Sequence, residues 1–274
     1  MYLLKNLLEE AKKANCAIPS CNFIDFLTAK SYLRVAEKRK LPLILSFAQA
    51  HQEYLDFDEA VLIGKYIKSI ANVPVNLHLD HGEDFETIKK AVDNGFDSVM
   101  IDASMKSFDE NVKLTRKVVE YAHGKNVAVE AELGHVGTGI TYSSNSDNIY
   151  TEPNEAKIFV EKTEVDALAV SIGTAHGKYK GEPKISFDVL EKINNEIDTP
   201  LVLHGGSSSG DENLRNCVIK GITKVNIYTD FVTEAVRNLE NTDDYFKLKE
   251  EMKTNVEKVL DHYYDVFLTD RISK

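Results

Sequence analysis

The sequence predicts an α/β fold, a (β/α)8 or TIM barrel, with a helix before the first strand and a helical extension after the last unit. Eight short apolar runs alternate with eight helical patterns along the 274 residues. The apolar runs are nearly continuous, which is typical of parallel strands that are covered on both faces. No dissimilar insert interrupts the alternation, so we expect one closed barrel domain over residues 1–274.

Each expected strand is followed by a segment with helical periodicity. An open, doubly wound sheet is the structural alternative, but it usually carries a glycine-rich motif after its first strand, and "CNFIDF" has none. The start "MYLLKNLLEEAKK" predicts a short amphipathic helix, and the chain beyond residue 240 predicts a helix outside the eightfold pattern. The expected strands are 17–23, 42–47, 75–80, 97–102, 127–133, 165–171, 200–204 and 223–228.

Composition narrows the classes of function. The formal net charge of −11 argues against a nucleic-acid partner, which requires a basic face. Cys16, Cys21 and Cys217 fit neither a zinc knuckle nor a disulfide framework, so we expect reduced thiols in a cytoplasmic protein. The start of the chain lacks a basic region and a cleavage site, and no apolar run approaches about 18 residues. We therefore expect neither a signal peptide nor a membrane span.

Polar side chains of the types that bind metals lie at the expected strand ends. In this fold the carboxyl ends of the strands carry the chemistry. A single histidine there is more often structural, but three that converge on one mouth, with an open fourth position, make a catalytic zinc site. We expect His78 to point to a different side from His81, and His51, His123, His135 and His262 to be packing or surface residues. The strand-end residues are Asn22, Asp80, His81, Asp102, Glu130, Glu132, His176, His204 and Asn226.

The stretch "LVLHGGSSSG", residues 201–210, predicts a phosphate site next to a metal ligand. The loops after strands seven and eight form the usual phosphate site of this barrel. Gly205, Gly206 and Ser207 can direct backbone N–H groups at a phosphate, helped by the next helix. The same stretch is equally compatible with a flexible loop before a capped helix that binds no phosphate. If the first reading holds, the substrate is a phosphorylated molecule whose carbonyl lies beside the metal.

Six segments in order make the chain similar to the zinc-dependent class II fructose-bisphosphate/tagatose-bisphosphate aldolases: "NLHLDHGEDFE", "SVMIDAS", "VEAELGHVG", "SIGTAHGKYKGEP", "LVLHGGSS" and "KVNIYTD". The resemblance covers roughly residues 4 to 240. It implies a (β/α)8 barrel, usually a homodimer or homotetramer, and Zn²⁺ held by His81, His176 and His204. It further implies that Asp80 is the acid/base for the C4 hydroxyl and that Glu132 is an alternative metal ligand.

The resemblance also implies a phosphorylated sugar as the substrate, with a monovalent cation, Na⁺ or K⁺, helping to bind its phosphate. The strand-end and loop patterns predict that Asn22 and Gly206 also bind the substrate or its phosphate. The positions that match the family's dihydroxyacetone phosphate site are Gly177, Lys180, Gly205, Ser207, Asn226 and Thr229.

Elementary chemistry agrees with this resemblance. Cleavage of a C–C bond beta to a carbonyl requires a group that stabilises the resulting enediolate and a base that takes the proton from the hydroxyl. Zinc as a Lewis acid supplies the first and Asp80 the second. The strand-six region offers His176 in place of a buried lysine, so a Schiff-base route is disfavoured.

Departures from the family pattern leave the substrate open. Gly139 and Ile140 stand where acids are expected, which leaves Asp147 or a solvent path as the proton donor to the enediolate. Ala48 replaces a common hydroxyl residue.

Asp244 stands where the family's arginine contacts the distal phosphate, and Arg237, Lys247 or Lys249 would have to compensate. The prediction is an aldolase for a ketose 1,6-bisphosphate; the alternative is one for a ketose 1-phosphate. A metal-dependent hydrolase is disfavoured because "PSCNF" lacks a His-x-His pair.

Overall fold

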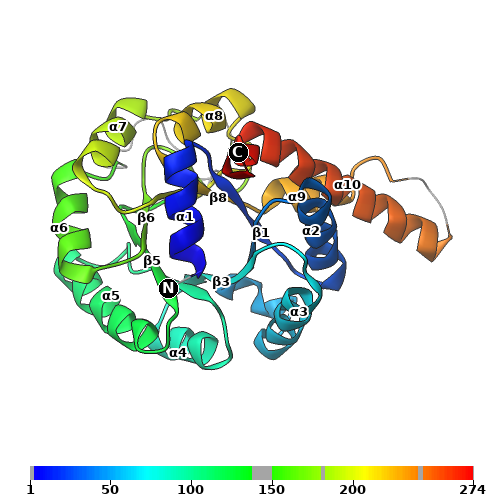
Figure 1. Ribbon diagram of the computed structural model, residues 1–274, viewed down its shortest axis with the longest axis horizontal. Coiled ribbons are helices and arrows are strands. Elements are labelled where there is room, and N and C mark those ends of the chain that lie inside the picture. Colours follow the sequence, from blue (N-terminus) through cyan, green and yellow to red (C-terminus); the bar gives the residue numbers. More distant parts are fainter. Residues whose placement is uncertain (1–2, 138–149, 180–182, 240–242, 274) are drawn as a thin grey trace.

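The computed structural model describes residues 3–137, 150–179, 183–239 and 243–273, and it confirms the predicted (β/α)8 barrel. Eight parallel strands follow one another around a closed ring, in which β1 pairs with β8. Figure 1 shows helices on the outside of this ring. The open, doubly wound alternative is therefore wrong. The strands are β1 (Ile18–Asn22), β2 (Leu43–Ala48), β3 (Val75–Gly82), β4 (Ser98–Ile101), β5 (Ala128–Leu133), β6 (Ala167–Val170), β7 (Leu201–Leu203) and β8 (Ile222–Ile227).

The helices begin where the sequence provides capping residues. Asp25, Asp56 and Ser107 form capping boxes at the starts of α2, α3 and α5, and these boxes satisfy backbone N–H groups that have no partner within the helix. The barrel helices are α2 (Phe26–Arg39), α3 (Phe57–Ile70), α4 (Phe85–Asp93), α5 (Phe108–His123), α6 (Pro153–Thr163), α7 (Phe187–Glu196), α8 (Asp211–Ile219) and α9 (Thr229–Ala235), with the 3-10 helix η1 (Gln49–Glu53) after β2.

The two additions outside the eightfold pattern are also helical. Helix α1 (Leu3–Ala14) lies across the barrel in Figure 1, and α10 (Tyr245–Val266) with the 3-10 helix η2 (Thr269–Ser273) ends the described chain. Tyr264 of α10 donates a hydrogen bond to the Pro42 carbonyl at 2.9 Å. The first turns of α10 project away from the barrel. No helix in the described ranges is long and apolar enough to cross a membrane.

The barrel interior changes from apolar to polar along its axis. Its floor is apolar, because Leu4 and Leu8 of α1 pack against Ile18, Ile44 and Val202. Each such buried leucine contributes about 1.5–3 kcal/mol to folding. A polar layer lies above this floor. Above that layer is the mouth of the barrel, the end at which the carboxyl ends of the strands meet. The polar layer contains Ser20, Ser46, Asn76, His78, Ser98, Glu130 and Lys224, all fully buried.

The polar layer is internally hydrogen-bonded, as buried polar groups require. Asn76 donates to the Ser98 hydroxyl at 2.7 Å, and His78 Nδ1 lies 2.8 Å from the same oxygen. Lys224 Nζ lies 2.9 Å from Glu130 Oε2. This layer therefore provides a fixed base beneath the mouth.

Candidate active site

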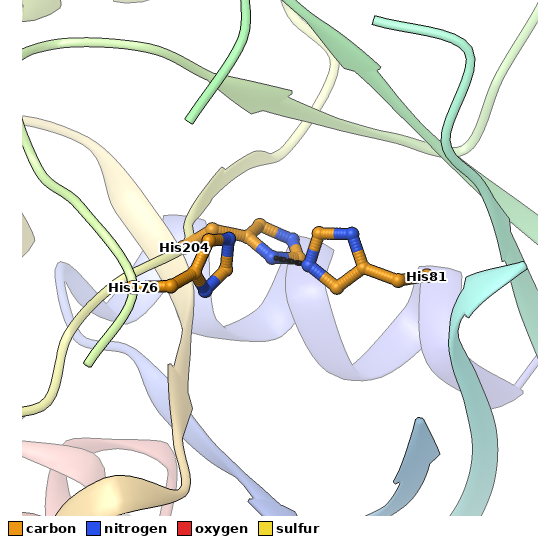
Figure 2. A group of neighbouring side chains, drawn as sticks. All are labelled: His81, His176 and His204. Atoms are coloured by element: carbon orange, nitrogen blue, oxygen red, sulfur yellow. Dashed lines mark hydrogen bonds between the residues drawn. The ribbon is translucent and has the colours of Figure 1, made fainter. Parts of the chain in front are cut away.

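Three imidazoles converge at the mouth of the barrel, as the sequence predicts. His81 comes from the end of β3, His176 from the loop after β6, and His204 from the residue after β7. Figure 2 shows their rings facing one another, and one nitrogen from each lies within 4.8 Å of the others. The backbone of His81 has φ +48°, which turns its side chain toward the mouth although Asp80, one residue earlier, also points there.

Carboxylates fix which nitrogen of two rings carries the proton. His81 Nδ1 lies 3.0 Å from Asp102 Oδ2, and His204 Nε2 lies 2.9 Å from Glu130 Oε1. Ionised carboxylates only accept hydrogen bonds, so these two nitrogens donate. In neutral rings the opposite nitrogens, His81 Nε2 and His204 Nδ1, would both carry lone pairs, and they lie 2.8 Å apart. Two facing lone pairs at this distance require a proton or a cation between them.

Glu132 lies beside one of these imidazoles, that of His81. Its Oε1 accepts the Val136 N–H at 3.0 Å, whereas its buried Oε2 has no hydrogen-bond partner among the described residues. Glu132, His81 and Asp102 also each offer a ligand atom within 4.8 Å of the others. Three imidazoles with a carboxylate are the donor set that zinc prefers, so the residues present fit this metal.

Burial and neighbouring charges shift the titration of the cluster. Burial raises the pKa of Glu132 to about 8, and the Asp102 carboxylate adds to this shift. Burial lowers the pKa of His176 to about 3, with a further contribution from His81. Burial alone would lower the pKa of His81, but Asp80 and the hydrogen bond to Asp102 raise it to about 9. The carboxylates thus favour positive charge at this point of the mouth.

Asp80 is held as a carboxylate beside the histidines. It is 4% exposed, and its two oxygens accept hydrogen bonds from Asn22 Nδ2 and Asn226 Nδ2, both at 2.8 Å. Burial alone would raise the pKa of Asp80, but the charges of His81 and His204 lower it below its usual range. Asp80 is therefore ionised and oriented, as a proton acceptor must be.

The glycines after β7 are required by close packing. Gly205 has φ +68°, and a Cβ there would lie 2.5 Å from the Ala175 carbonyl oxygen. A Cβ at Gly206 would lie 2.9 Å from the Asn226 carbonyl oxygen. By contrast, a Cβ at Gly177, which has φ +82°, would meet no described atom within 4 Å. No described atom therefore fills the space beside the loop after β6.

Several groups of the expected phosphate loop form hydrogen bonds with other parts of the chain. The Gly206 N–H donates to the Asn226 carbonyl at 3.3 Å, and the Ser208 N–H donates to Asp230 at 3.0 Å. The Ser207 hydroxyl accepts the N–H groups of Tyr228 and Asp230 at 3.2 and 3.3 Å. The loop is thus anchored to the segment after β8, where Thr229 begins α9.

Several expected residues lie outside the described ranges or elsewhere. Lys180, Gly139, Ile140 and Asp147 belong to the segments that are not described. Asp244 is the N-cap of α10, where its side chain accepts the N–H groups of Phe246 and Lys247. Its place at the projecting start of α10 is away from the mouth of its own barrel.

The expected compensating cations are placed as follows. Arg237 pairs with Glu234 at 2.7 Å, and Lys249 lies 5.3 Å from the centre of the Tyr245 ring. Arg237 also lines a cavity of about 670 Å³ between α9 and α10. That cavity is not lined by any of the three histidines, so its size does not make it the reaction site.

The expectation for His78 is wrong. Side chains alternate along a strand, so His78 shares the inward face of β3 with Asp80 and lies in the polar layer. Burial lowers its pKa to about 3, and Lys224 adds to that shift. Counting back from His81 gives the wrong face for His78, because the left-handed backbone of His81 breaks the alternation. Lys224 is a further inward residue that the sequence signals, because it lies two residues before Asn226 on the same strand.

The comparisons with known proteins agree with this geometry. The family described as fructose-bisphosphate aldolase class II matches residues 3–270. A fructose-bisphosphate aldolase from Geobacillus stearothermophilus is 41% identical over 242 residues, which cover 86% of this chain and 84% of that protein. One from Staphylococcus aureus is 38% identical over 248 residues, covering 88% and 86%.

Solved structures give the same result. The crystal structure of the YdjI aldolase from Escherichia coli K12 superposes with a TM-score of 0.87 at 31% identity, covering 97% of each chain. That of a putative fructose-1,6-bisphosphate aldolase from Coccidioides immitis superposes with a TM-score of 0.86 at 29% identity, covering 96% of this chain and 95% of the other.

Proposed function

The chain belongs to the class II fructose-bisphosphate aldolase family, and we propose that it reversibly cleaves a ketose 1,6-bisphosphate into dihydroxyacetone phosphate and an aldehyde phosphate. The observation that carries this proposal is an oriented, ionised Asp80 beside three converging imidazoles. A base and a metal site in contact are what an aldol cleavage requires.

The metal of this family is generally zinc, and we assign its ligands to His81, His176 and His204, with Glu132 as an alternative ligand. When bound, zinc supplies a Lewis acid that stabilises the negative charge of the enediolate. The chain's own contribution is orientation, because Asp102 and Glu130 hold two of the three rings by their second nitrogens. Such carboxylate–histidine contacts fix the nitrogen that faces the metal.

Asp80 removes the proton from the C4 hydroxyl in the cleavage direction and returns it in the condensation direction. Asn22 and Asn226 occupy one hydrogen-bonding position on each carboxylate oxygen, and this leaves further lone pairs for a substrate hydroxyl. Because the two amides come from β1 and β8, the carboxylate of β3 is held by side chains from two strands that do not pair with β3. Asn22 and Asn226 are therefore positioning residues as well as candidate substrate contacts.

We assign the phosphate of the dihydroxyacetone half to the loops after β6, β7 and β8. Gly177 supports this assignment because no described atom fills the space beside it, and Gly205 because it brings the backbone of the loop after β7 close to Ala175. A monovalent cation, Na⁺ or K⁺, would further neutralise the phosphate. The remaining residues assigned to this site are Lys180, Gly206, Ser207, Asn226 and Thr229.

The alternative substrate is a ketose 1-phosphate, and one observation favours it. Asp244 caps α10 and does not bring a cation to the mouth, so the distal phosphate lacks the arginine that the family pattern provides. The test is the ratio of kcat/KM for fructose 1,6-bisphosphate to that for fructose 1-phosphate. A ratio above about 10³, equivalent to ~4 kcal/mol, supports the bisphosphate and implies another cation. A ratio near one supports the monophosphate.

We further propose that residues 1–274 form one domain, that the protein acts in the cytoplasm, and that it forms a homodimer or homotetramer. The start of α10 supports the last point, since it projects from the barrel with Phe246 79% exposed. Sedimentation analysis of the intact protein tests the oligomeric state.

A further inference from the structure

His51 is a half-buried histidine at the mouth to which the proposed reaction assigns no role. It lies in η1, directly after β2, and its ring packs against the ring of Tyr228, which follows β8. The two ring centres are 4.2 Å apart, with planes tilted by 38°. Because β1 lies between β8 and β2, this ring pair spans the end of β1, where Asn22 binds Asp80. We call His51 and Tyr228 the aromatic wall.

Neither nitrogen of His51 has a hydrogen bond within the described part of the chain. Nδ1 is buried and closed off from solvent, whereas Nε2 is accessible, so Nε2 is the nitrogen that a substrate can reach. Burial lowers the pKa of His51, with the charge of Asp80 acting in the opposite direction. The ring is therefore neutral near pH 7, and a neutral imidazole nitrogen pairs well with a hydroxyl group, which both donates and accepts.

The order of strands around the barrel indicates which part of a substrate would meet this nitrogen. In a ring of eight strands, β7 and β3 lie opposite each other. A phosphate at the loop after β7 and a C4 hydroxyl at Asp80 on β3 therefore place the substrate across the mouth. The atoms beyond C4 then lie on the side of β3 and its neighbour β2, from which His51 extends. In addition, Ala48 pairs in register with Asp80, and its small side chain leaves room there.

We propose that His51 is a specificity-determining residue that hydrogen-bonds a hydroxyl group on the aldehyde half of the substrate. The proposal rests on the proposed function and extends it to the class of aldehyde. It implies that the protein favours aldehydes with a hydroxyl group next to the carbonyl. A site that pairs a ring nitrogen with a substrate hydroxyl discriminates against the analogue that lacks it. Tyr228 acts through His51 by holding its ring.

The test separates the two halves of the substrate. Condensation of dihydroxyacetone phosphate is measured with glyceraldehyde 3-phosphate and with its 2-deoxy analogue, for the wild type, His51→Phe and His51→Gln. His51→Phe keeps the ring packing but removes both nitrogens, so kcat/KM should fall about tenfold with the hydroxylated aldehyde and less than twofold with the analogue. His51→Gln places an amide near the position of Nε2 and should retain most of the preference.

Solvent proton exchange into dihydroxyacetone phosphate alone provides the internal control. This partial reaction involves no aldehyde, so it should be unchanged within about twofold in both variants. His262→Phe, at an exposed position on α10, is the matched control and should change neither reaction. Equal losses with both aldehydes, no loss with either, or a parallel loss of proton exchange would overturn the role of His51. A wild type without exchange or cleavage would instead refute the proposed function.

Discussion

Asp80 combines two properties that oppose each other in most carboxyl groups: it is almost completely buried, yet it is ionised. Burial favours the neutral acid, but two amide donors and the neighbouring imidazoles favour the carboxylate. A base that must collect a proton at neutral pH requires this balance. Asp80 and His81 are adjacent at the end of one strand, yet we propose different roles for them: Asp80 is the base and His81 is a zinc ligand.

The substitution Asp80→Asn removes the base but keeps the shape of the side chain. The cleavage rate should fall by about 10²–10⁴-fold, the usual contribution of a positioned acid/base, while zinc content stays at the wild-type value. Steady-state kinetics and metal analysis on the same preparation measure both quantities. Near-normal cleavage by this variant would move the role to another residue.

Glu130 is a residue whose role is indirect. It is fully buried, receives a hydrogen bond from His204, and pairs with Lys224. Burial alone would raise its pKa, but Lys224 and His204 lower it to about 2. The negative charge that orients His204 is thus maintained by Lys224, which lies in the polar layer.

Glu130→Gln should therefore weaken zinc binding by about 10–100-fold, the usual effect of losing such a contact. The dissociation constant is measured by competition with a chelator. Ser98→Ala is the matched control, because it disturbs His78 and Asn76 in the same polar layer but touches no ligand. Equal zinc affinity in Glu130→Gln and the wild type would show that the contact is only structural.

At the level of elements, the strands were predictable and the ends of strands were less so. Each of the eight predicted strands begins and ends within two residues of the observed strand. The agreement is close because continuous apolar runs mark strands that are covered on both faces. The inward face of β3 was misjudged, because the left-handed backbone of His81 depends on the local turn and not on periodicity. The cap role of Asp244 was missed because one alignment position says little about a helix start.

The opposite end of the barrel, away from the site, allows a test of how the stability of the fold depends on pH. Asp166, which precedes β6, accepts the Val129 N–H at 2.9 Å, and His123 Nε2 lies 2.8 Å from it. Burial alone would raise its pKa, but these two hydrogen bonds lower it. A lowered folded-state pKa means that this carboxylate stabilises the fold above the unfolded value of about 3.9. The stabilisation is lost as the pH falls through the folded-state value.

Asp166→Asn should therefore lower the free energy of unfolding by about 1.5–3 kcal/mol at pH 7, the range for hydrogen bonds to a charged group. The difference from the wild type should shrink as the pH falls below about 4. Urea unfolding of both proteins at several pH values measures it. A difference that stays constant with pH would mean that the charge of Asp166 contributes nothing.

At the level of the whole molecule, the barrel is arranged in layers that lead to one site. Helix α1 closes the apolar floor, the polar layer with Lys224 and Glu130 lies above it, and the histidines lie at the mouth. The three histidines, Asp80 and the glycine loop were predictable, since strand-end position and residue type suffice to identify them. Glu130 was also among the predicted strand-end residues, but its contacts were not predictable. The same is true of the roles of Lys224 and the aromatic wall, because these depend on contacts between strands far apart in the sequence.

The central claim is that His81, His176 and His204 hold the zinc on which cleavage depends. The most direct measurement is the zinc content and the rate of fructose 1,6-bisphosphate cleavage of His204→Ala beside the wild type, with the circular dichroism spectrum as the control for folding. The account predicts that this variant loses both zinc and cleavage while its spectrum is unchanged. Full zinc occupancy in folded His204→Ala, or undiminished cleavage without zinc, would contradict it.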